Sequence, residues 1–334
     1  MQTVDDFEDV QQSYRDFARN EVELSACFSR WAAAVAEDPE IVALLATLPP
    51  GKRQPNLVFA AARWNDSGTG PYDDLRTTLL SRWQAVRDSV LARSTQTNEV
   101  GRCAALIPLL AHLPQPLALL EVGASAGLCL FPDRYSYRYS NGAALDPADG
   151  VSPVVLPCEI SGSVPVPQRL PEIAWRRGID LNPLNAANED SMAWLEALVW
   201  PEHEDRRLRL AAAISMARQN PPTLVAGDLI ETVGDVAATA PSNATLIVFT
   251  APYSHTCRSR SANRGWSWRW RCPAIGSATK PRTCWRRYPQ QPRARLPRGR
   301  SSPSRSTANA SAGRMVMADP CCGAERASAG RDPH

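Results

Sequence analysis

Histidine is scarce in this chain, with four in 334 residues, and none of the nine cysteines forms a C-x-x-C pair. This distribution argues against a zinc site and against a disulfide framework. No apolar run is long enough to cross a bilayer, and the N-terminus is acidic and polar, unlike a signal peptide. We therefore expect a cytoplasmic protein with no metal site and no membrane partner.

Aliphatic residues are almost missing from residues 253–334, which contain only three Ile, Leu or Val. The same residues carry 17 Lys+Arg and 3 Asp+Glu, a balance of +14, whereas residues 1–252 have a balance of −11. Because so little apolar surface cannot offset the entropy lost on folding, this composition predicts a disordered tail. If the basic tail is native, its charge makes nucleic acid a candidate partner.

The abrupt change at residue 253 favours a second interpretation, in which the tail is the product of a frameshift. The apolar strand sequence NATLIVFT ends directly before it. In the neighbouring reading frame, the codons of residues 250–257, 274–281 and 299–320 permit sequences with new histidines and with hydrophobic patterning. The third of them reads as two strands joined by an Asp-Gly turn. On this interpretation the chain lacks the last strands of its sheet, and we expect it to be inactive as written.

Residues 1–115 are predicted to form a mainly helical N-terminal region. Apolar residues within 4–48 recur at the three- and four-residue spacing of amphipathic helices. Further helices are expected over 54–64, 72–93 and 97–113.

Residues 116–252 show a different pattern, in which short apolar runs alternate with helical stretches. This alternation predicts an α/β fold with a doubly wound, mainly parallel sheet. A region rich in Pro, Gly and Ser, about 137–171, is interpreted as an insertion with short strands. The expected strands are 117–122, 174–181, 222–229 and 244–250, with a helical stretch over 189–219.

The sequence LALLEVGASAGLCLF, residues 117–131, is typical of a strand, a tight turn of small residues and the start of a helix. In open parallel sheets, ligands bind at the carboxyl ends of the strands, and a helix N-terminus there offers free N–H groups. The turn is therefore a candidate cofactor loop. Such turns also occur as simple connections, and that alternative stays open.

The turn resembles the first motif of class I S-adenosylmethionine-dependent methyltransferases, in which an acidic residue precedes alternating small residues. The matching residues are Glu121, Gly123, Ser125 and Gly127, with serine in place of the usual middle glycine. The resemblance implies a Rossmann-like domain of the methyltransferase type, in which these four residues face the methionine part of S-adenosylmethionine.

The next two strands end in carboxylates that fit the same resemblance. Asp180 ends the GID sequence and Asp228 follows AG in AGDL. The resemblance implies that Asp180 binds the ribose and Asp228 the adenine. Asp180 lies 59 positions after Glu121, whereas a compact unit has roughly 20, so an insertion is required. No catalytic base or methyl acceptor is identified.

The same turn also fits G-x-S-x-G, the nucleophile elbow of serine hydrolases, with Ser125 as the nucleophile. The upstream His-Gly stretch of those enzymes is missing, and the later histidines are His203, His255 and His334. A dinucleotide fingerprint fails, because Ser125 stands where the second glycine of G-x-G-x-x-G would be. The serine hydrolase remains an alternative.

Polar residues between the apolar helices are candidates for the roof of a pocket over the turn. They could equally serve as helix caps and loop hydrogen bonds. The residues are Lys52, Arg53, Gln54, Asn56, Gln96, Asn98, Glu99 and Arg102.

A family resemblance is carried by the segments LPPGKRQPNLVFAAARW, STQTNEVGRCAALIPLL, LLEVGASAGLCLFPDRYSYRY, GIDLNP and ALVWPEHEDRR. Together they closely resemble an uncharacterised bacterial family known as domain of unknown function 2332, over roughly residues 10–250. The later segments of that family resemble the neighbouring-frame readings, which favours the frameshift. The family implies no activity, so the methyltransferase hypothesis depends on the turn and the strand ends.

Overall fold

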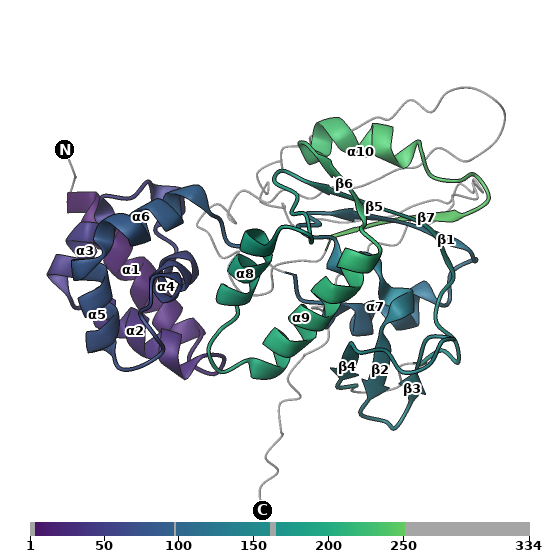
Figure 1. Cartoon of the computed structure of the whole chain (residues 1–334), viewed down its shortest axis with the longest axis horizontal. Helices are drawn as coiled ribbons and strands as arrows, with labels where there is room; N and C mark the ends of the chain where they lie inside the picture. The colour runs from purple at the N-terminus through teal and green to yellow at the C-terminus, as the bar shows by residue number, and fades with distance from the viewer. Residues whose placement is uncertain (1–3, 97, 161–164, 251–334) are drawn as a thin grey trace, which may run out of the picture.

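The computed structural model describes residues 4–96, 98–160 and 165–250. The tail of residues 253–334 lies outside the described residues, and with it the predicted disorder, frameshift and nucleic-acid binding. Figure 1 shows a helical region formed by the N-terminal part of the chain beside a sheet with its covering helices.

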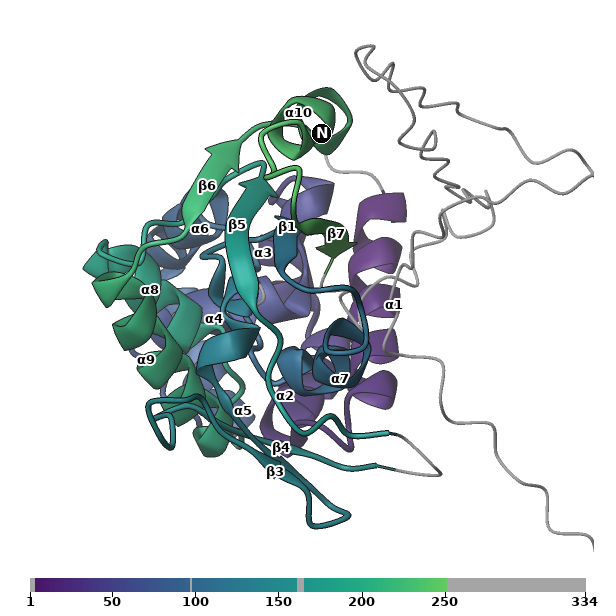
Figure 2. The same cartoon turned by 90° about the vertical axis from the view of Figure 1, so that its right-hand side faces the viewer.

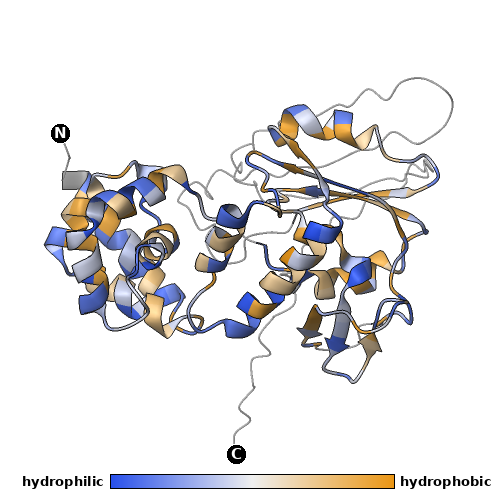
Figure 3. Cartoon of the chain, viewed as in Figure 1, coloured by the Kyte–Doolittle hydropathy of each residue, from blue (hydrophilic) through white to orange (hydrophobic). Residues whose placement is uncertain are grey.

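The N-terminal region is helical, as its periodicity predicts, and Figure 3 shows the mixture of polar and apolar faces on its helices. Side-chain oxygens of Ser25 and Asp38 accept hydrogen bonds from backbone N–H groups at the starts of two helices, the usual N-cap arrangement. The helices are α1 (Val4–Asn20), α2 (Ala26–Ala36), α3 (Pro39–Ala46), α4 (Pro55–Trp64), α5 (Tyr72–Ser81) and α6 (Trp83–Ala92).

Two predicted helices differ from those observed. The stretch 72–93 forms two helices, because Arg82 leaves the helical conformation and its guanidinium binds Asp66 at 2.7 Å. The stretch 97–113 contains a shorter helix, α7 (Arg102–Leu110), because Asn98 faces the turn after the first strand instead of extending the helix.

The core of the helical region is aromatic. The ring of Phe59 on α4 contacts the rings of Tyr14, Phe28 and Trp31, with centroids 5.8, 5.1 and 5.5 Å apart. All four side chains are buried. Such edge-to-face pairs add to the stabilisation from burial, so this region has a hydrophobic core of its own.

The main sheet is parallel and follows a doubly wound order. Its strands are β1 (Leu117–Val122), β5 (Ile173–Asp180), β6 (Thr223–Ala226) and β7 (Thr245–Thr250), arranged β6-β5-β1-β7 (Figure 2). Numbered by occurrence, this order is 3-2-1-4, the first part of the Rossmann order. The prediction of an α/β fold with a Rossmann-like, mainly parallel sheet is confirmed.

Helices cover both faces of this sheet (Figure 1). On one face, α10 (Leu229–Ala237) packs Val233 and Val236 in a cluster with Ala118 and Leu120 of β1. On the other face, α7 and α9 (Glu204–Gln219) share a larger cluster with Leu119. The helix α10 was not predicted, and it shortens the strand expected over 222–229.

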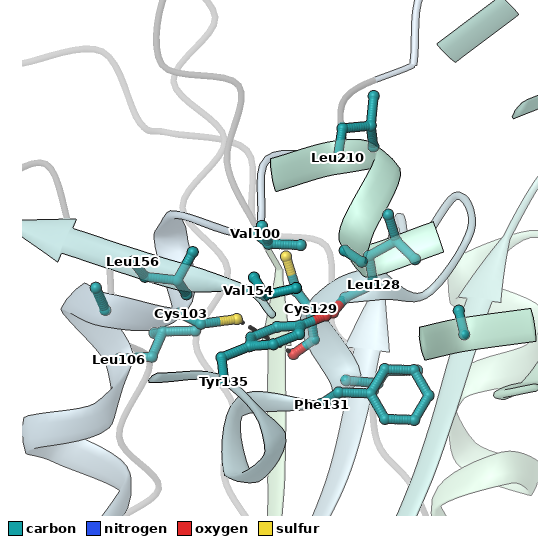
Figure 4. Packing of buried hydrophobic residues seen from close by; sticks show 14 of the residues in the cluster. Val100, Cys103, Leu106, Leu128, Cys129, Phe131, Tyr135, Val154, Leu156 and Leu210 are labelled. Atoms are coloured by element: carbon teal, nitrogen blue, oxygen red, sulfur yellow. Dashed lines mark hydrogen bonds between the residues drawn. The ribbon is translucent and has the colours of Figure 1, made fainter. Parts of the chain in front are cut away.

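The predicted helix start after the turn was wrong. After β1 the chain forms two short 3-10 turns, Leu128–Leu130 and Pro132–Arg134, instead of an α-helix. Gly127 has a left-handed φ of 68°, and Leu128, Cys129 and Leu130 are all buried, which anchors the chain to the core. Figure 4 shows this packing around Tyr135.

A small second sheet takes the place of that helix. It consists of β2 (Ser136–Tyr139), β3 (Ala144–Leu145) and β4 (Val155–Cys158), in the order β3-β2-β4. The short strands expected in the insertion are thus present. They explain the long interval between Glu121 and Asp180, because the chain builds this sheet before it returns to the main one.

The connection between β5 and β6 is docked on the helical region. Its first helix is α8 (Glu189–Ala197), and Trp194 on that helix is buried in the aromatic cluster of the helical region. The carboxylate of Glu202 accepts hydrogen bonds from the Ser25 hydroxyl at 2.8 Å and the Cys27 N–H at 2.7 Å. These contacts hold the helical region against the crossover.

Candidate functional site

The turn after β1 has a left-handed backbone at three alternating positions. The φ angles are 72° at Gly123, 49° at Ser125 and 68° at Gly127. A Cβ added at Gly123 would meet nothing within 4 Å, whereas one at Gly127 would lie 2.8 Å from Pro222 Cγ. Glycine thus leaves the turn open at Gly123 and permits close packing at Gly127.

Ser125 is held by two amide side chains that precede α7. Asn98 Nδ2 donates to the Ser125 hydroxyl at 2.7 Å, and that hydroxyl donates to Gln96 Oε1. Asn98 Oδ1 also accepts from the Ala126 N–H at 3.1 Å. Because Ser125 is only 3% exposed, its hydroxyl faces these amides and not the solvent.

Five of the other polar residues proposed as a roof bind through their side chains to partners outside the turn, whereas Arg102 lies near enough to Glu121 to interact with its charge. Lys52 donates to the Arg93 carbonyl, Arg53 binds Asp6, and Trp200 donates to Asn56. Gln54 accepts from Thr95, and Glu99 pairs with Arg206 at 2.6 Å. Of this set, Gln96 and Asn98 hold the turn by direct side-chain hydrogen bonds.

Asp180 joins the segments that follow three neighbouring strands. Its Oδ2 accepts from the Ser125 N–H at 2.7 Å, and its Oδ1 accepts from the Asn182 N–H at 2.8 Å. Its backbone carbonyl accepts from the Gly227 N–H at 3.0 Å. The carboxylate predicted from the strand end therefore lies beside the turn, and it is only half-buried.

Glu121 is the second-to-last residue of β1, near the same edge of the sheet. Its side chain is buried, and its Oε2 finds no hydrogen-bond partner among the residues that the structure describes. Burial raises the pKa of this carboxyl well above its ordinary value; Cys129 and Asp180 act in the same direction, and Arg102 opposes them. A buried carboxyl with an unused oxygen at the end of a central strand is a candidate ligand-binding group.

Asp228 lies at the start of α10, one residue beyond Gly227. Its side chain accepts a hydrogen bond of 2.7 Å from the Ile230 N–H and so caps the helix. Apolar residues close in sequence to Asp180 and Asp228 are exposed: the exposed fraction is 78% for Leu181 and 54% for Ile230. The edge of the sheet therefore combines carboxylates with uncovered apolar surface.

The arrangement of the described residues offers Ser125 no catalytic histidine. His203 Nε2 contacts the Leu24 carbonyl at 2.8 Å, and His112 Nδ1 contacts the Pro108 carbonyl at 2.5 Å. Both rings are engaged away from the turn. His255 and His334 lie outside the described residues, so the serine hydrolase remains a hypothesis.

Within residues 4–96, 98–160 and 165–250, no group of three or more His, Cys, Asp or Glu is placed to hold a metal ion. The helices in these ranges are too short or too polar for any of them to span a bilayer.

Gly178 is a site residue that the sequence analysis missed. It lies on β5 opposite Glu121 of β1. A Cβ there would lie 2.6 Å from the Ala124 Cβ and 2.5 Å from Leu224 Cδ2. Glycine is needed at this position because the turn lies directly on the strand, and an isolated glycine within a strand is the signal for such an approach.

Comparison with known proteins supports the family resemblance. A family model described as "Uncharacterized protein conserved in bacteria (DUF2332)" matches residues 11–263. No curated protein and no solved structure matches the chain. The match covers the helical region from the middle of α1 onward, the described strands of the main sheet and the turn after β1. The chain therefore belongs to the bacterial family DUF2332.

Proposed function

We propose that the carboxyl edge of the main sheet binds S-adenosylmethionine and that the protein is related in function to methyltransferases. The observation that carries the proposal is the position of Asp180. Its carboxylate ends the strand next to β1, touches the turn of small residues and remains half-exposed. A carboxylate in this position suits the hydroxyl groups of a ribose, and its two observed bonds leave acceptor sites unused.

The neighbouring residues fit the remaining parts of such a ligand. The exposed side chains of Leu181 and Ile230 offer apolar surface to an adenine ring beside Asp228. The open backbone at Gly123 allows a chain of small atoms to approach β1, and Glu121, two residues earlier, has a carboxyl oxygen with no hydrogen-bond partner among the described residues. The order 3-2-1-4 also puts the turn at the switch point between β1 and β7.

In a methyl transfer, S-adenosylmethionine supplies an electrophilic methyl group, and S-adenosylhomocysteine is the product. The protein contributes mainly by holding the acceptor in line with the bond that breaks. Among the described residues, Asp180, Glu121 and the turn are those that support the cofactor side of this proposal. They do not identify the acceptor or a base.

Titration calorimetry with S-adenosylhomocysteine and S-adenosylmethionine tests the proposal on the full chain. We expect saturable binding that weakens about tenfold or more in Asp180→Ala. Asp149→Ala is the matched control, because Asp149 is exposed and lies in the insertion, and it should bind as the unmodified protein does. Absence of binding to either ligand at millimolar concentration would overturn the proposal, and binding of a different nucleotide would redirect it.

A further inference from the structure

The segment between α6 and α7 connects the helical region to the candidate site. At its start, the Arg93 guanidinium lies over the rings of Trp64 and Trp194, 4.5 and 5.0 Å from their centroids. The same guanidinium binds Asp190 at 2.8 Å, and the Ser94 carbonyl accepts from Trp194 Nε1 at 3.0 Å. This end is therefore attached to both α4 and α8.

At the other end, the amides of Gln96 and Asn98 each use a donor and an acceptor. Gln96 accepts from the Ser125 hydroxyl and donates to the Asn182 carbonyl at 3.1 Å. Asn98 donates to the Ser125 hydroxyl and accepts from the Ala126 N–H. Gln96 thus bridges the turn after β1 and the loop after β5, and Asn98 holds the turn itself.

These contacts hold the backbone of Ser125 in an unfavourable conformation. Ser125 has a left-handed φ of 49°, which costs free energy for a residue other than glycine and persists only where the surroundings enforce it. Asn182 lies two residues beyond Asp180, so the Gln96 bridge also sets how the Asp180 loop lies against the turn.

We propose that Gln96 and Asn98 are positioning residues, which hold the two ligand loops in their binding arrangement and tie that arrangement to the helical region. As far as it concerns ligand affinity, this inference rests on the proposed S-adenosylmethionine site. Neither side chain needs to touch the ligand. Its effect passes through Ser125, Ala126 and Asn182, and a loosened loop must be ordered again when a ligand binds.

Hydrogen exchange measured by mass spectrometry on the full chain tests the positioning without any ligand. We expect Gln96→Ala to raise exchange about fivefold or more in peptides covering 121–130 and 178–186, and Asn98→Ala to do so in 121–130. Exchange in α1 and α3 should stay unchanged, which separates local loosening from a failure to fold. Gln84→Ala is the matched control, because Gln84 lies on α6 and its side-chain amide donates to Asp88 on the same helix.

Two conservative variants separate the individual bonds. Gln96→Glu keeps an acceptor for the Ser125 hydroxyl but loses the donor to the Asn182 carbonyl, so it should loosen 178–186 more than 121–130. Asn98→Asp keeps the acceptor for the Ala126 N–H and loses the donor to Ser125, so it should loosen 121–130 alone. These variants also serve if an alanine variant fails to fold.

Affinity for S-adenosylhomocysteine gives the second measurement. If the unmodified protein binds, we expect Gln96→Ala to weaken binding about tenfold, and unchanged affinity would overturn the role in ligand binding. If the unmodified protein does not bind but the variants loosen both loops, the positioning is supported and only the proposed function fails. Unchanged exchange in both loops overturns the positioning whatever the ligand.

Discussion

Asp180 and Ser125 are 55 residues apart in the chain, yet the Asp180 carboxylate accepts a 2.7 Å hydrogen bond from the Ser125 N–H. This bond joins the end of β5 to the turn after β1. In the sequence, the small sheet of β2, β3 and β4 lies between the two residues. The second oxygen of the carboxylate accepts from Asn182. One side chain therefore organises two loops at the edge where parallel sheets bind ligands.

The first prediction concerns the stability that this carboxylate contributes. Asp180→Ala removes the acceptor of two backbone N–H groups and should lower the free energy of unfolding by about 1–3 kcal/mol. Urea unfolding followed by circular dichroism measures the change. Asp149→Ala should stay within about 0.5 kcal/mol of the unmodified protein. An equal loss in both variants would contradict the organising role of Asp180.

The second prediction separates the hydroxyl of Ser125 from its backbone strain. Ser125→Ala and Ser125→Gly both lose the bonds to Gln96 and Asn98, but only glycine relieves the positive φ. Ser125→Gly should therefore be more stable than Ser125→Ala by about 1 kcal/mol. Thermal and urea unfolding of the pair decide this. A more stable alanine variant would show that the left-handed backbone carries no strain.

The third prediction tests the close approach at Gly178. In Gly178→Ala the new methyl group would collide with Ala124, whose backbone belongs to the turn, so the turn or the strand must shift. We expect a loss of about 1–3 kcal/mol in the free energy of unfolding, as for other overpacked sites. Gly51→Ala is the control, because its Cβ would meet nothing within 4 Å. Equal stability of the two variants would contradict this packing.

The fourth prediction follows from the raised pKa of Glu121. The unfolded chain releases this proton above about pH 4.5, whereas burial makes the folded state retain it. The folded state therefore binds more protons, and this contribution to stability falls as pH rises from about 4.5 toward the raised pKa of the folded state. Glu121→Gln removes the titration.

Unfolding at about pH 5 and about pH 8 measures the effect. The gain in stability from Glu121→Gln should be larger at the higher pH, whereas Glu8→Gln, on an exposed part of α1, should show no such difference. If the benefit of Glu121→Gln were the same at both pH values, Glu121 would titrate alike in the folded and unfolded states.

Much of the fold is predictable because many of its helices and strands have local patterns of apolar residues that are typical of them. The run 117–122 forms β1 with the expected bounds, and 244–250 forms β7 within one residue. Continuous apolar runs are typical of strands buried on both faces of a parallel sheet. Helices α1 to α3 likewise lie in the stretch with three- and four-residue spacing, and the ends of β1, β5 and β6 place Glu121, Asp180 and Asp228 at one edge.

Other features depend on contacts that no local pattern contains. The helix expected after the turn is absent because Gly127 turns the backbone to the left and buried residues anchor the next segment. Gln96 and Asn98 stood among eight polar candidates, and only the folded arrangement brings these two amides onto Ser125. The strand predicted over 222–229 includes Leu229, whereas the side chain of Asp228 caps a helix, α10, that begins at Leu229.

The sequence by itself determined the fold class, the family, the helical N-terminal region and the edge of the sheet where the candidate site lies. Strand positions and strand ends follow from hydrophobic period and turn residues, which act over a few positions. Only the tertiary structure decided which side chains meet there. The structure brings together Asn98, Ser125, Gly178 and Asp180, although the bonded pairs are 27 and 55 residues apart in the sequence and a small sheet intervenes. The reason is that burial of several apolar surfaces at once selects one arrangement of the whole chain.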